Sequence, residues 1–331
     1  MRVGVVGLGN WGVRICESIG RCDQVEIVRG MDVDKATAEA AATRFGFPLC
    51  DSYDDLLAEP SVEGVILVTP PSGHLEQVLK AAAAGKHVLC EKPLALRRAD
   101  AVRMVEACES RGLVLGIDHE RRFEPGWEEL QRVVESGELG TLLHVEGNHS
   151  HSWMGALPRD TWRGSKAEGA AAGLTGMGVH IIDVLVSLLG PVAQVFAVSA
   201  DRVHGFENGD VFSTQLRWPD GTTGTITNLC ATPTFARIAV FGSQGWIEVR
   251  EQDMLSSVRT SQCTLALEGK EHQVTVFPTA DEVQAAVSAW ADSVENGTPY
   301  RYRSSELIGN TAAYEAIGRS IISGAPEAVE N

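Results

Sequence analysis

The sequence predicts two domains: a doubly wound parallel α/β domain over residues 1–121, followed by an α+β domain with a mostly antiparallel sheet over residues 122–331. Three observations predict this. The chain has 331 residues, about twice the usual size of one domain. Its first 120 residues alternate short apolar runs with helical stretches, which is typical of right-handed strand–helix–strand crossovers and a parallel sheet. From about residue 140, strand-like segments follow one another without intervening helices, which favours antiparallel pairing.

The elements of the first domain are delimited by glycines and short apolar runs. Gly46, Gly85 and Gly112 each follow a helical pattern at the position where helices commonly end. Because ligands bind outside the carboxyl ends of parallel strands, we expect the site at that edge of the sheet. The expected strands cover residues 3–6, 25–31, 62–68, 87–90 and 114–117, and the expected helices cover residues 13–19, 36–45, 75–84 and 99–110.

The second domain shows the period of two that is typical of half-buried strands. Leu143, Val145 and Gly147 alternate with polar residues, and a Pro-Asp-Gly turn at 219–221 separates two later strands. A further helix is expected to begin within residues 173–178 and to end at Gly190. The later expected strands cover residues 212–218, 223–229, 237–241, 246–250, 263–267 and 273–277, and two closing helices cover residues 281–295 and 304–323.

Composition excludes several classes of protein. The formal net charge is −16, of which −12 falls in residues 122–331, so binding to nucleic acid or to an anionic membrane surface is not expected. No apolar run approaches the roughly 18 residues that span a bilayer, and glycines interrupt the short apolar start, which argues against a secretory signal. Seven cysteines without metal-ligand spacing favour reduced thiols in a cytoplasmic protein.

A glycine-rich turn carries the first chemical signal. The motif Gly7-x-Gly9-x-x-Gly12 follows a strand and opens a helix, and Asp32 lies 20 residues after Gly12. This is the dinucleotide-binding fingerprint of a Rossmann domain: the glycines bring the helix N-terminus close to a pyrophosphate, and the acidic residue accepts hydrogen bonds from ribose hydroxyls. A 2′-phosphate would meet the Asp32 carboxylate as a like charge, so NAD is predicted over NADP. The contacts predicted from this segment are Gly7, Gly9, Asn10, Trp11, Gly12 and Asp32.

Residues 84–94, AGKHVLCEKPL, resemble the family of glucose–fructose oxidoreductase and inositol dehydrogenase (Gfo/Idh/MocA). The resemblance implies a Rossmann domain, a second domain with an open sheet through which members form dimers or tetramers, and nicotinamide-dependent redox chemistry at a carbinol carbon. It also implies cofactor contacts at Thr69, Pro70, His74, Glu91 and Lys92. The other segments that carry it are 69–71 with His74, 122–123, 137–140, 162–163 and 178–183.

Lys92 is the predicted proton acid/base. A lysine at the carboxyl end of the fourth parallel strand borders the cofactor crevice, where desolvation and a nearby nicotinamide cation lower its pKa toward neutrality. The alternative is a surface ion pair with Glu91. The resemblance favours catalysis, and it implies that the Lys92–Pro93 peptide bond is cis, as is common in the family.

His180 and Asp183 form a second candidate constellation. They are three residues apart on an expected helix, so they share a face, and the carboxylate can orient the imidazole. The alternative is a buried histidine with a structural role. Enzymes such as inositol dehydrogenase carry Asp four residues before this histidine, where this chain has Gly176. That departure weakens the prediction of a simple polyol dehydrogenase.

Two aromatic segments are further candidates. Trp162 and Arg163 can stack on a sugar ring and bind its oxygens, or Trp162 can simply anchor its loop. His149 and His151 share a strand face, but no third metal ligand has suitable spacing, so no metal is predicted.

The predicted function is an NAD-dependent oxidoreductase that moves hydride between nicotinamide and a carbinol carbon of a sugar, polyol or related alcohol. Two alternatives remain at this point. One is a redox-assisted glycosidase that holds NAD tightly and regenerates it in each cycle. The other is a non-catalytic nucleotide-binding sensor, which the glycine at position 176 makes more plausible. Most of the negative charge lies in the second domain, so a neutral substrate is expected, although Arg122 or Arg163 could locally reverse this preference.

Overall fold

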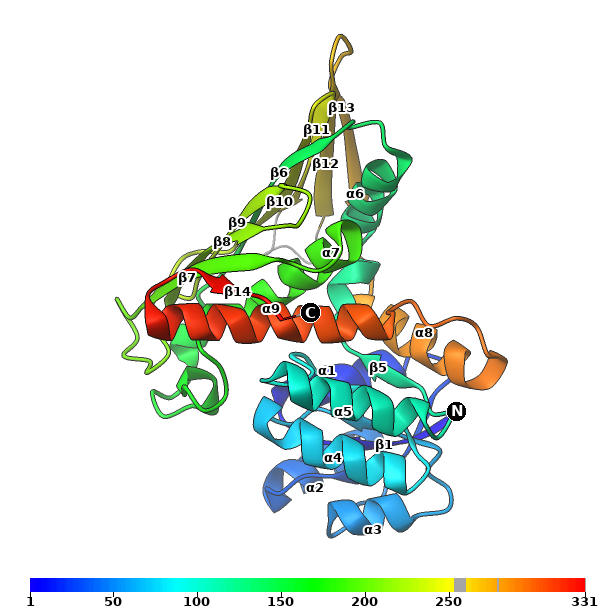
Figure 1. Ribbon diagram of the computed structural model, residues 1–331. Helices are drawn as coiled ribbons and strands as arrows, with labels where there is room; N and C mark the ends of the chain where they lie inside the picture. The colour runs from blue at the N-terminus through cyan, green and yellow to red at the C-terminus, as the bar shows by residue number, and fades with distance from the viewer. Residues whose placement is uncertain (253–259, 279, 331) are drawn as a thin grey trace. The chain divides into compact units, whose positions relative to one another are not determined.

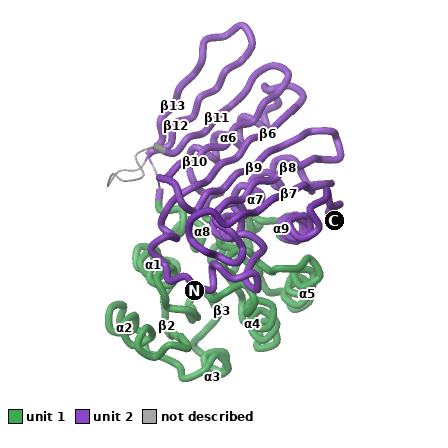
Figure 2. The backbone as a smooth tube through the Cα atoms, turned by 90° about the vertical axis from the view of Figure 1, so that its left-hand side faces the viewer, with its two compact units in different colours: residues 1–120, 281–307 green, residues 121–280, 308–331 purple. Residues whose placement is uncertain are grey.

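A computed structural model describes residues 1–252, 260–278 and 280–330. The chain divides into two compact units, residues 1–120 with 281–307 (unit 1) and residues 121–280 with 308–331 (unit 2), coloured separately in Figure 2. The sequence predicted a single domain boundary near residue 121, whereas in the structure the chain re-enters unit 1 at residues 281–307. The reason is hydrophobic: Val283, Val287 and Trp290 are buried in the same core as Val3, Ile15 and other residues of unit 1.

Unit 1 contains the predicted parallel sheet. Its five strands have the order β2-β1-β3-β4-β5, and every pair is parallel. Figure 1 labels β1 and β5 of this sheet. The order reverses between β1 and β3, which is the switch point where such sheets bind ligands. The strands are β1 Arg2–Val6, β2 Glu26–Met31, β3 Gly64–Leu67, β4 His87–Cys90 and β5 Leu115–Ile117; the helices are α1 Asn10–Ile19, α2 Lys35–Phe45, α3 Tyr53–Ala58, α4 Pro71–Ala83, α5 Arg98–Glu109 and α8 Glu282–Asn296.

Unit 2 contains a nine-stranded sheet of order β13-β12-β11-β10-β6-β9-β8-β7-β14. Only the β6–β9 pair is parallel among the strands of this described sheet, so the prediction of a mostly antiparallel sheet is confirmed. The strands are β6 Leu142–Ser150, β7 Gln194–Ala200, β8 Val211–Arg217, β9 Thr223–Leu229, β10 Phe235–Gly242, β11 Gly245–Gln252, β12 Thr260–Leu267, β13 Gln273–Pro278 and β14 Glu327–Ala328.

Helices of unit 2 pack against one face of this sheet. α6 (Pro125–Ser136) lies against β11–β13, and α7 (Val179–Leu189) lies against β6. α9 (Ser304–Ser323) contributes its residues from 308 onward, and its Ser320 hydroxyl accepts a hydrogen bond from the backbone N–H of Ala197 in β7. In the part of the chain that the structure describes, no helix combines the length and apolarity that a bilayer crossing requires. All seven cysteines are described and are free thiols.

Candidate cofactor and catalytic site

The glycine-rich loop between β1 and α1 has the geometry of a pyrophosphate cradle. Gly7 has φ +92°, and a side chain there would lie 2.3 Å from the carbonyl oxygen of Val68. A Cβ at Gly12 would lie 2.1 Å from the carbonyl oxygen of Gly7, so only glycine permits this close packing of helix and loop. Gly9 faces open space, because no described residue other than its chain neighbours has an atom within 4 Å of the position that a Cβ would take. The loop therefore leaves room for a phosphate beside the N-terminus of α1.

Asp32 is anchored beside this loop. Its Oδ2 accepts a hydrogen bond from the backbone N–H of Leu8 at 2.6 Å, and its Oδ1 accepts one from the N–H of Asp34 at 2.8 Å. These bonds fix the carboxylate at the end of β2, where it can still accept from ribose hydroxyls through its remaining lone pairs. The loop and Asp32 together fit a dinucleotide without a 2′-phosphate.

Substitutions at two glycines of this loop are expected to have different effects on NAD binding and on stability. Replacing Gly9 with alanine is expected to weaken NAD binding by about tenfold or more, because the methyl group occupies the space left for phosphate, and to change the free energy of unfolding by less than about 0.5 kcal/mol. Gly12→Ala instead places a methyl group against backbone and is expected to cost about 1–3 kcal/mol of stability. Titration with NADH, followed by its fluorescence, measures the change in cofactor affinity. Chemical denaturation measures the change in stability. Equal losses of stability would contradict the assigned geometry.

His74 joins the two loops that follow β3 and β4. Its ring is fully buried; Nε2 lies 2.9 Å from the carbonyl oxygen of Thr69, and Nδ1 lies 3.0 Å from that of Pro93. Thr69 is held further, because its hydroxyl donates to the Gln77 side chain at 2.6 Å. The Lys92–Pro93 peptide bond is cis, as the resemblance implied. His74 therefore positions the Lys92–Pro93 segment, and direct contact with the cofactor stays a prediction for Thr69, Pro70 and His74.

Lys92 and Glu91 leave the sheet at the carboxyl end of β4. The Glu91 side chain is buried and accepts a hydrogen bond from the indole N–H of Trp11, in the first turn of α1. Its other oxygen accepts from the backbone N–H of Lys92 at 3.1 Å. Glu91 thus connects the lysine to the glycine-rich loop. The sequence named Glu91 and Trp11 as cofactor contacts but carried no sign of the bond between them.

Asp118 is a buried group of this site that the sequence reasoning missed. It follows β5, next to Glu91, and burial together with the Glu91 charge raises the pKa of its carboxyl group well above the usual range. Only the register of β4 against β5 brings these residues together. The available signal was an acidic residue directly after a predicted buried strand, at the edge where ligands bind.

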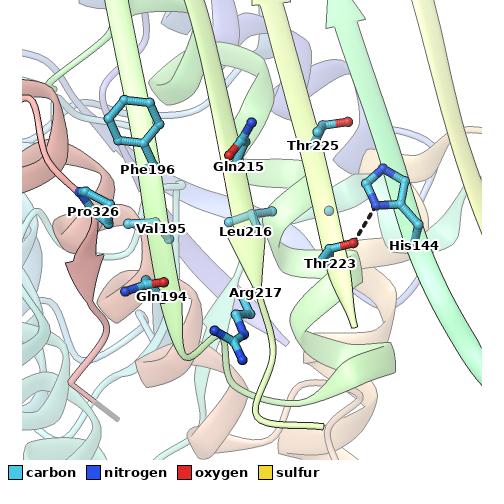
Figure 3. Close-up of a pocket in the computed structure, with 11 residues that line it drawn as sticks. His144, Gln194, Val195, Phe196, Gln215, Leu216, Arg217, Thr223, Thr225 and Pro326 are labelled. Atoms are coloured by element: carbon cyan, nitrogen blue, oxygen red, sulfur yellow. Dashed lines mark hydrogen bonds between the residues drawn. The ribbon is translucent and has the colours of Figure 1, made fainter. Parts of the chain in front are cut away.

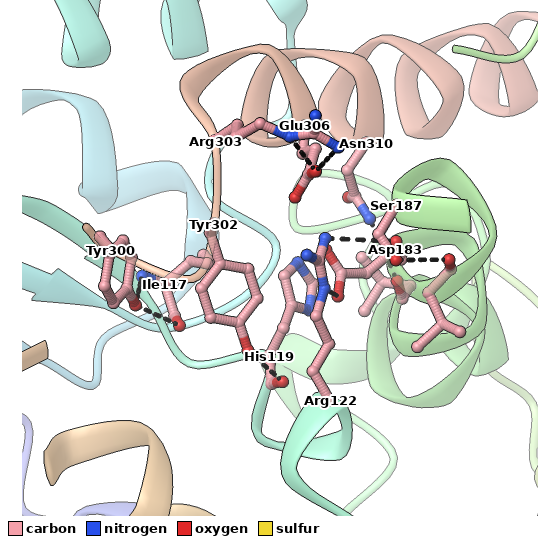
Figure 4. Close-up of polar contacts among 12 residues, drawn as sticks. Ile117, His119, Arg122, Asp183, Ser187, Tyr300, Tyr302, Arg303, Glu306 and Asn310 are labelled. Atoms are coloured by element: carbon pink, nitrogen blue, oxygen red, sulfur yellow. Dashed lines mark hydrogen bonds and ion pairs between the residues drawn. The ribbon is translucent and has the colours of Figure 1, made fainter. Parts of the chain in front are cut away.

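Within unit 2, Asp183 forms a buried ion pair with Arg122 (Figure 4). The guanidinium Nε lies 2.6 Å from Oδ2 and its terminal nitrogen 2.7 Å from Oδ1. Both carboxylate oxygens therefore accept hydrogen bonds from Arg122, and the orientation of His180 by this carboxylate stays a prediction. The pairing also neutralises the charge that Arg122 would otherwise present to an anionic substrate.

His180 lies in the first turn of α7 and is buried. A π-helical turn, Leu174–Gly178, precedes it and packs closely on β9: a Cβ at Gly178 would lie 2.4 Å from the Asn228 amide oxygen. The Asn228 amide in turn donates to the carbonyl oxygen of His149 at 2.9 Å. These contacts fix the backbone from which His180 projects, and its catalytic role stays a prediction.

Gly176 has no such packing requirement. Apart from its chain neighbours and the backbone of its own helix, no described residue has an atom within 4 Å of an ideal Cβ at this position, and its φ is not positive. Replacing Gly176 with alanine is therefore expected to stabilise the protein by about 0.5–1 kcal/mol, because it reduces the entropy of the unfolded chain. Gly178→Ala, two residues away, is expected to destabilise it through contact with Asn228. Denaturation midpoints measure both, and a destabilising Gly176→Ala would show that this space is not available.

Trp162 and Arg163 belong to an aromatic cluster in unit 2. The Arg163 guanidinium lies 4.2 Å from the Trp162 ring centre and 5.5 Å from that of Trp153, a half-exposed residue. The Trp153 indole N–H donates to His151 Nε2 at 2.6 Å. Arg163 thus lies against two indole rings, and Trp153 and His151 join the residues that the sequence placed in this region.

No group of three or more potential ligands among the described residues could hold a metal ion. His149 and His151 lie with ring centres 5.8 Å apart, edge to face. The structure thus brings these two histidines together without adding a third ligand from the described part of the chain.

A hollow of about 540 Å³ lies on the sheet of unit 2 (Figure 3). Its wall is formed by β6–β9 and Pro326, and includes His144, Phe196 and Arg217. None of the residues predicted to bind cofactor or substrate lines it. The hollow is therefore not the predicted catalytic site.

Comparisons with known proteins agree with these features. Residues 1–119 match the model of the Gfo/Idh/MocA oxidoreductase family with its NAD-binding Rossmann fold, and residues 127–248 match the model of the C-terminal domain. Myo-inositol 2-dehydrogenase of Thermotoga maritima is 31% identical over 261 residues, which cover 75% of this chain and 74% of that protein. The chain belongs to the Gfo/Idh/MocA family. It is an oxidoreductase whose Rossmann domain binds NAD.

Other Gfo/Idh/MocA proteins resemble it over nearly their whole length. D-xylose 1-dehydrogenase (NADP(+)) 2 of Haloferax volcanii is 28% identical, covering 98% of each chain. A levoglucosan dehydrogenase solved with NADH and levoglucosan superposes with a TM-score of 0.86 at 19% identity, covering 100% of this chain and 99% of that one. At that identity the structural match shows the fold alone.

Proposed function

We propose that this protein moves a hydride between NAD and a carbinol carbon of a sugar, a polyol or a related alcohol, with Lys92 as the proton acid/base. The observation that carries the proposal is the position of Lys92 at the carboxyl end of β4, with Glu91 linking its backbone to Trp11 in the first turn of α1. The names of the relatives support the substrate class, because inositol is a polyol and xylose a sugar.

Bound NAD would supply the hydride acceptor, and residues of the protein move the proton. Lys92 takes the hydroxyl proton of the alcohol, and the positive charge of a nearby nicotinamide together with partial desolvation would favour its neutral amine. The cis Lys92–Pro93 segment is held by His74, so the base is attached to fixed backbone. In the reverse direction the ammonium returns the proton to the alkoxide oxygen.

Four residues of unit 2 complete the proposal. His180 binds or polarises the reacting hydroxyl, while Trp162 and Arg163 contact the rest of the substrate. Asp183 orients the His180 imidazole, and its ion pair with Arg122 holds the carboxylate in place. With Arg122 neutralised and most of the negative charge in residues 122–331, we propose a neutral substrate.

We also propose that the protein forms a homodimer or homotetramer through the face of the unit 2 sheet away from α6 and α7. Val198 of β7 and Val274 and Val276 of β13 are more than half exposed. Their register partners Ser213, Thr264 and Gln262 alternate with buried residues, as expected for a face left for another subunit. Light scattering in solution tests this assembly.

The function is tested by giving cofactor-stripped protein NAD together with a panel of sugars, polyols and their glycosides. Stoichiometric NADH with oxidised substrate is the expected result. Aglycone release without net NADH would instead identify the redox-assisted glycosidase. NAD binding with neither product, across the whole panel, would favour the nucleotide sensor over an enzyme.

A further inference from the structure

Two acidic side chains leave the parallel sheet of unit 1 side by side. Cys90 of β4 and Ile117 of β5 are register partners, and the backbone N–H of Asp118 donates to the carbonyl oxygen of Cys90 at 2.9 Å. Glu91 and Asp118, the next residues on the two strands, therefore emerge as neighbours at the carboxyl edge of the sheet. Their carboxyl groups interact with each other electrostatically.

Both side chains are buried, but their surroundings differ. Glu91 is 7% exposed and its two oxygens accept from the Trp11 indole and the Lys92 backbone N–H. Asp118 is 1% exposed, and it interacts with the Glu91 carboxyl group and with the Trp11 indole, whose N–H donates to Glu91. Donors stabilise the charged form, so Glu91 is the carboxylate of the pair and Asp118 the carboxylic acid.

A proton between the two groups accounts for this arrangement. Two carboxylates have no donor between them, whereas an acid and a carboxylate share a strong hydrogen bond. Burial raises the pKa of Glu91, and burial together with the Glu91 charge raises that of Asp118. Two other ionisable side chains interact with the pair: the positive charge of Lys92 attracts both carboxylates, and the negative charge of Glu120 repels that of Glu91. The neighbouring Cys90 thiol is buried, which raises its pKa, so it stays neutral.

We propose that the Glu91–Asp118 pair holds one proton in the cofactor-free protein, releases it to solvent when NAD⁺ binds, and keeps it when NADH binds. Trp11 bonds the pair to the first turn of α1, directly after the glycine-rich loop, so the pair borders the NAD site. The nicotinamide of NAD⁺ carries a positive charge that NADH lacks, and a cation beside a buried acid favours its ionisation. Loss of one proton thus offsets the charge that the site gains.

The same pair completes the proton balance of the reaction, and this step rests on the proposed function. Oxidation of an alcohol by NAD⁺ gives a carbonyl compound, NADH and one proton. Lys92 takes that proton from the hydroxyl group, and the ionised pair beside it takes the proton from Lys92. The pair thereby regains its proton at the moment when the positive charge of the cofactor disappears. Asp118 is therefore a positioning and proton-holding residue that acts through Lys92.

Calorimetric titration of the full-length protein with NAD⁺ and with NADH, in two buffers of different ionisation enthalpy, tests the proposal. The expected result is release of about one proton per NAD⁺ and of none per NADH. The affinity for NAD⁺ should accordingly rise with pH, by up to about tenfold per pH unit, while the affinity for NADH stays level. Equal proton release with the two cofactors, or none with NAD⁺, would overturn the proposal.

Asp118→Asn keeps the shape of the side chain and removes its titration. It is expected to abolish proton release and to flatten the pH dependence of NAD⁺ affinity, whereas Asp51→Asn, an exposed aspartate of the same unit, should leave both unchanged. Release that persists in Asp118→Asn would assign the proton elsewhere and overturn the proposal. If this variant does not fold, the two wild-type titrations still decide. No substrate is needed, so failure here is distinct from failure to oxidise sugars or polyols.

Discussion

Replacing Lys92 with methionine is expected to reduce turnover of an identified substrate about 10²–10⁴-fold, the usual contribution of a general acid or base. Methionine fills a similar volume but cannot take a proton. NAD binding should change little, because the glycine-rich loop and Asp32 are untouched. Steady-state kinetics and cofactor titration separate the two effects: kcat falls while the Kd for NAD stays nearly constant.

Lys80→Met is the matched control for this substitution. Lys80 lies on α4 of the same unit, and its half-exposed ammonium pairs with Asp54 and Glu76 on the surface. Its loss should leave turnover unchanged. If Lys92→Met keeps normal turnover, or if the two variants lose activity equally, Lys92 is not the acid/base.

Replacing Arg122 with alanine is expected to destabilise the protein by about 3–5 kcal/mol, because it leaves the Asp183 carboxylate buried without its partner. The side chains of Arg122 and Asp183 are 4% and 1% exposed, and they are joined by two charge-assisted hydrogen bonds. Chemical denaturation of the full-length protein, followed by tryptophan fluorescence, measures the loss of stability.

An exposed pair and a double variant serve as controls. Arg132→Ala removes a surface pair with Glu129, in which the arginine is 59% exposed, and should leave the stability nearly unchanged. Arg122→Met combined with Asp183→Leu removes both charges and should recover much of the stability. A loss in Arg122→Ala no larger than that in Arg132→Ala would show that the buried pair does not stabilise the domain.

Most strands and helices could be predicted from local pattern, since each leaves its period in a short window of sequence. Helices α3 and α6 and strand β7 were not among the predicted elements. The fingerprint at Gly7, Gly9 and Gly12, with Asp32, could be predicted for the same reason. The sequence could not predict that α8 packs in the core of unit 1. Val283 and Trp290 show that the helix has an apolar side, but not which of the two cores that side joins.

Contacts between residues that are distant in the sequence could not be predicted either. Arg122 and Asp183 are 61 positions apart, and the sequence offered His180 as the nearer partner for the carboxylate. Glu91 and Asp118 meet only because β4 and β5 align Cys90 with Ile117. Shifting that register by one residue would turn the two acidic side chains away from each other. Such contacts depend on register and packing, which a single sequence does not encode locally.

Hydride transfer from the carbinol carbon is the step on which the proposed function depends, and an isotope label can follow it. A sugar or polyol that the protein oxidises is labelled with deuterium on the reacting carbon, and the reduced cofactor is analysed by mass spectrometry after a single turnover. We expect the deuterium to appear in NADH, and we expect Lys92→Met to slow its appearance without preventing NAD binding. Unlabelled NADH, or substrate cleavage that leaves NAD oxidised, would contradict hydride transfer from this carbon.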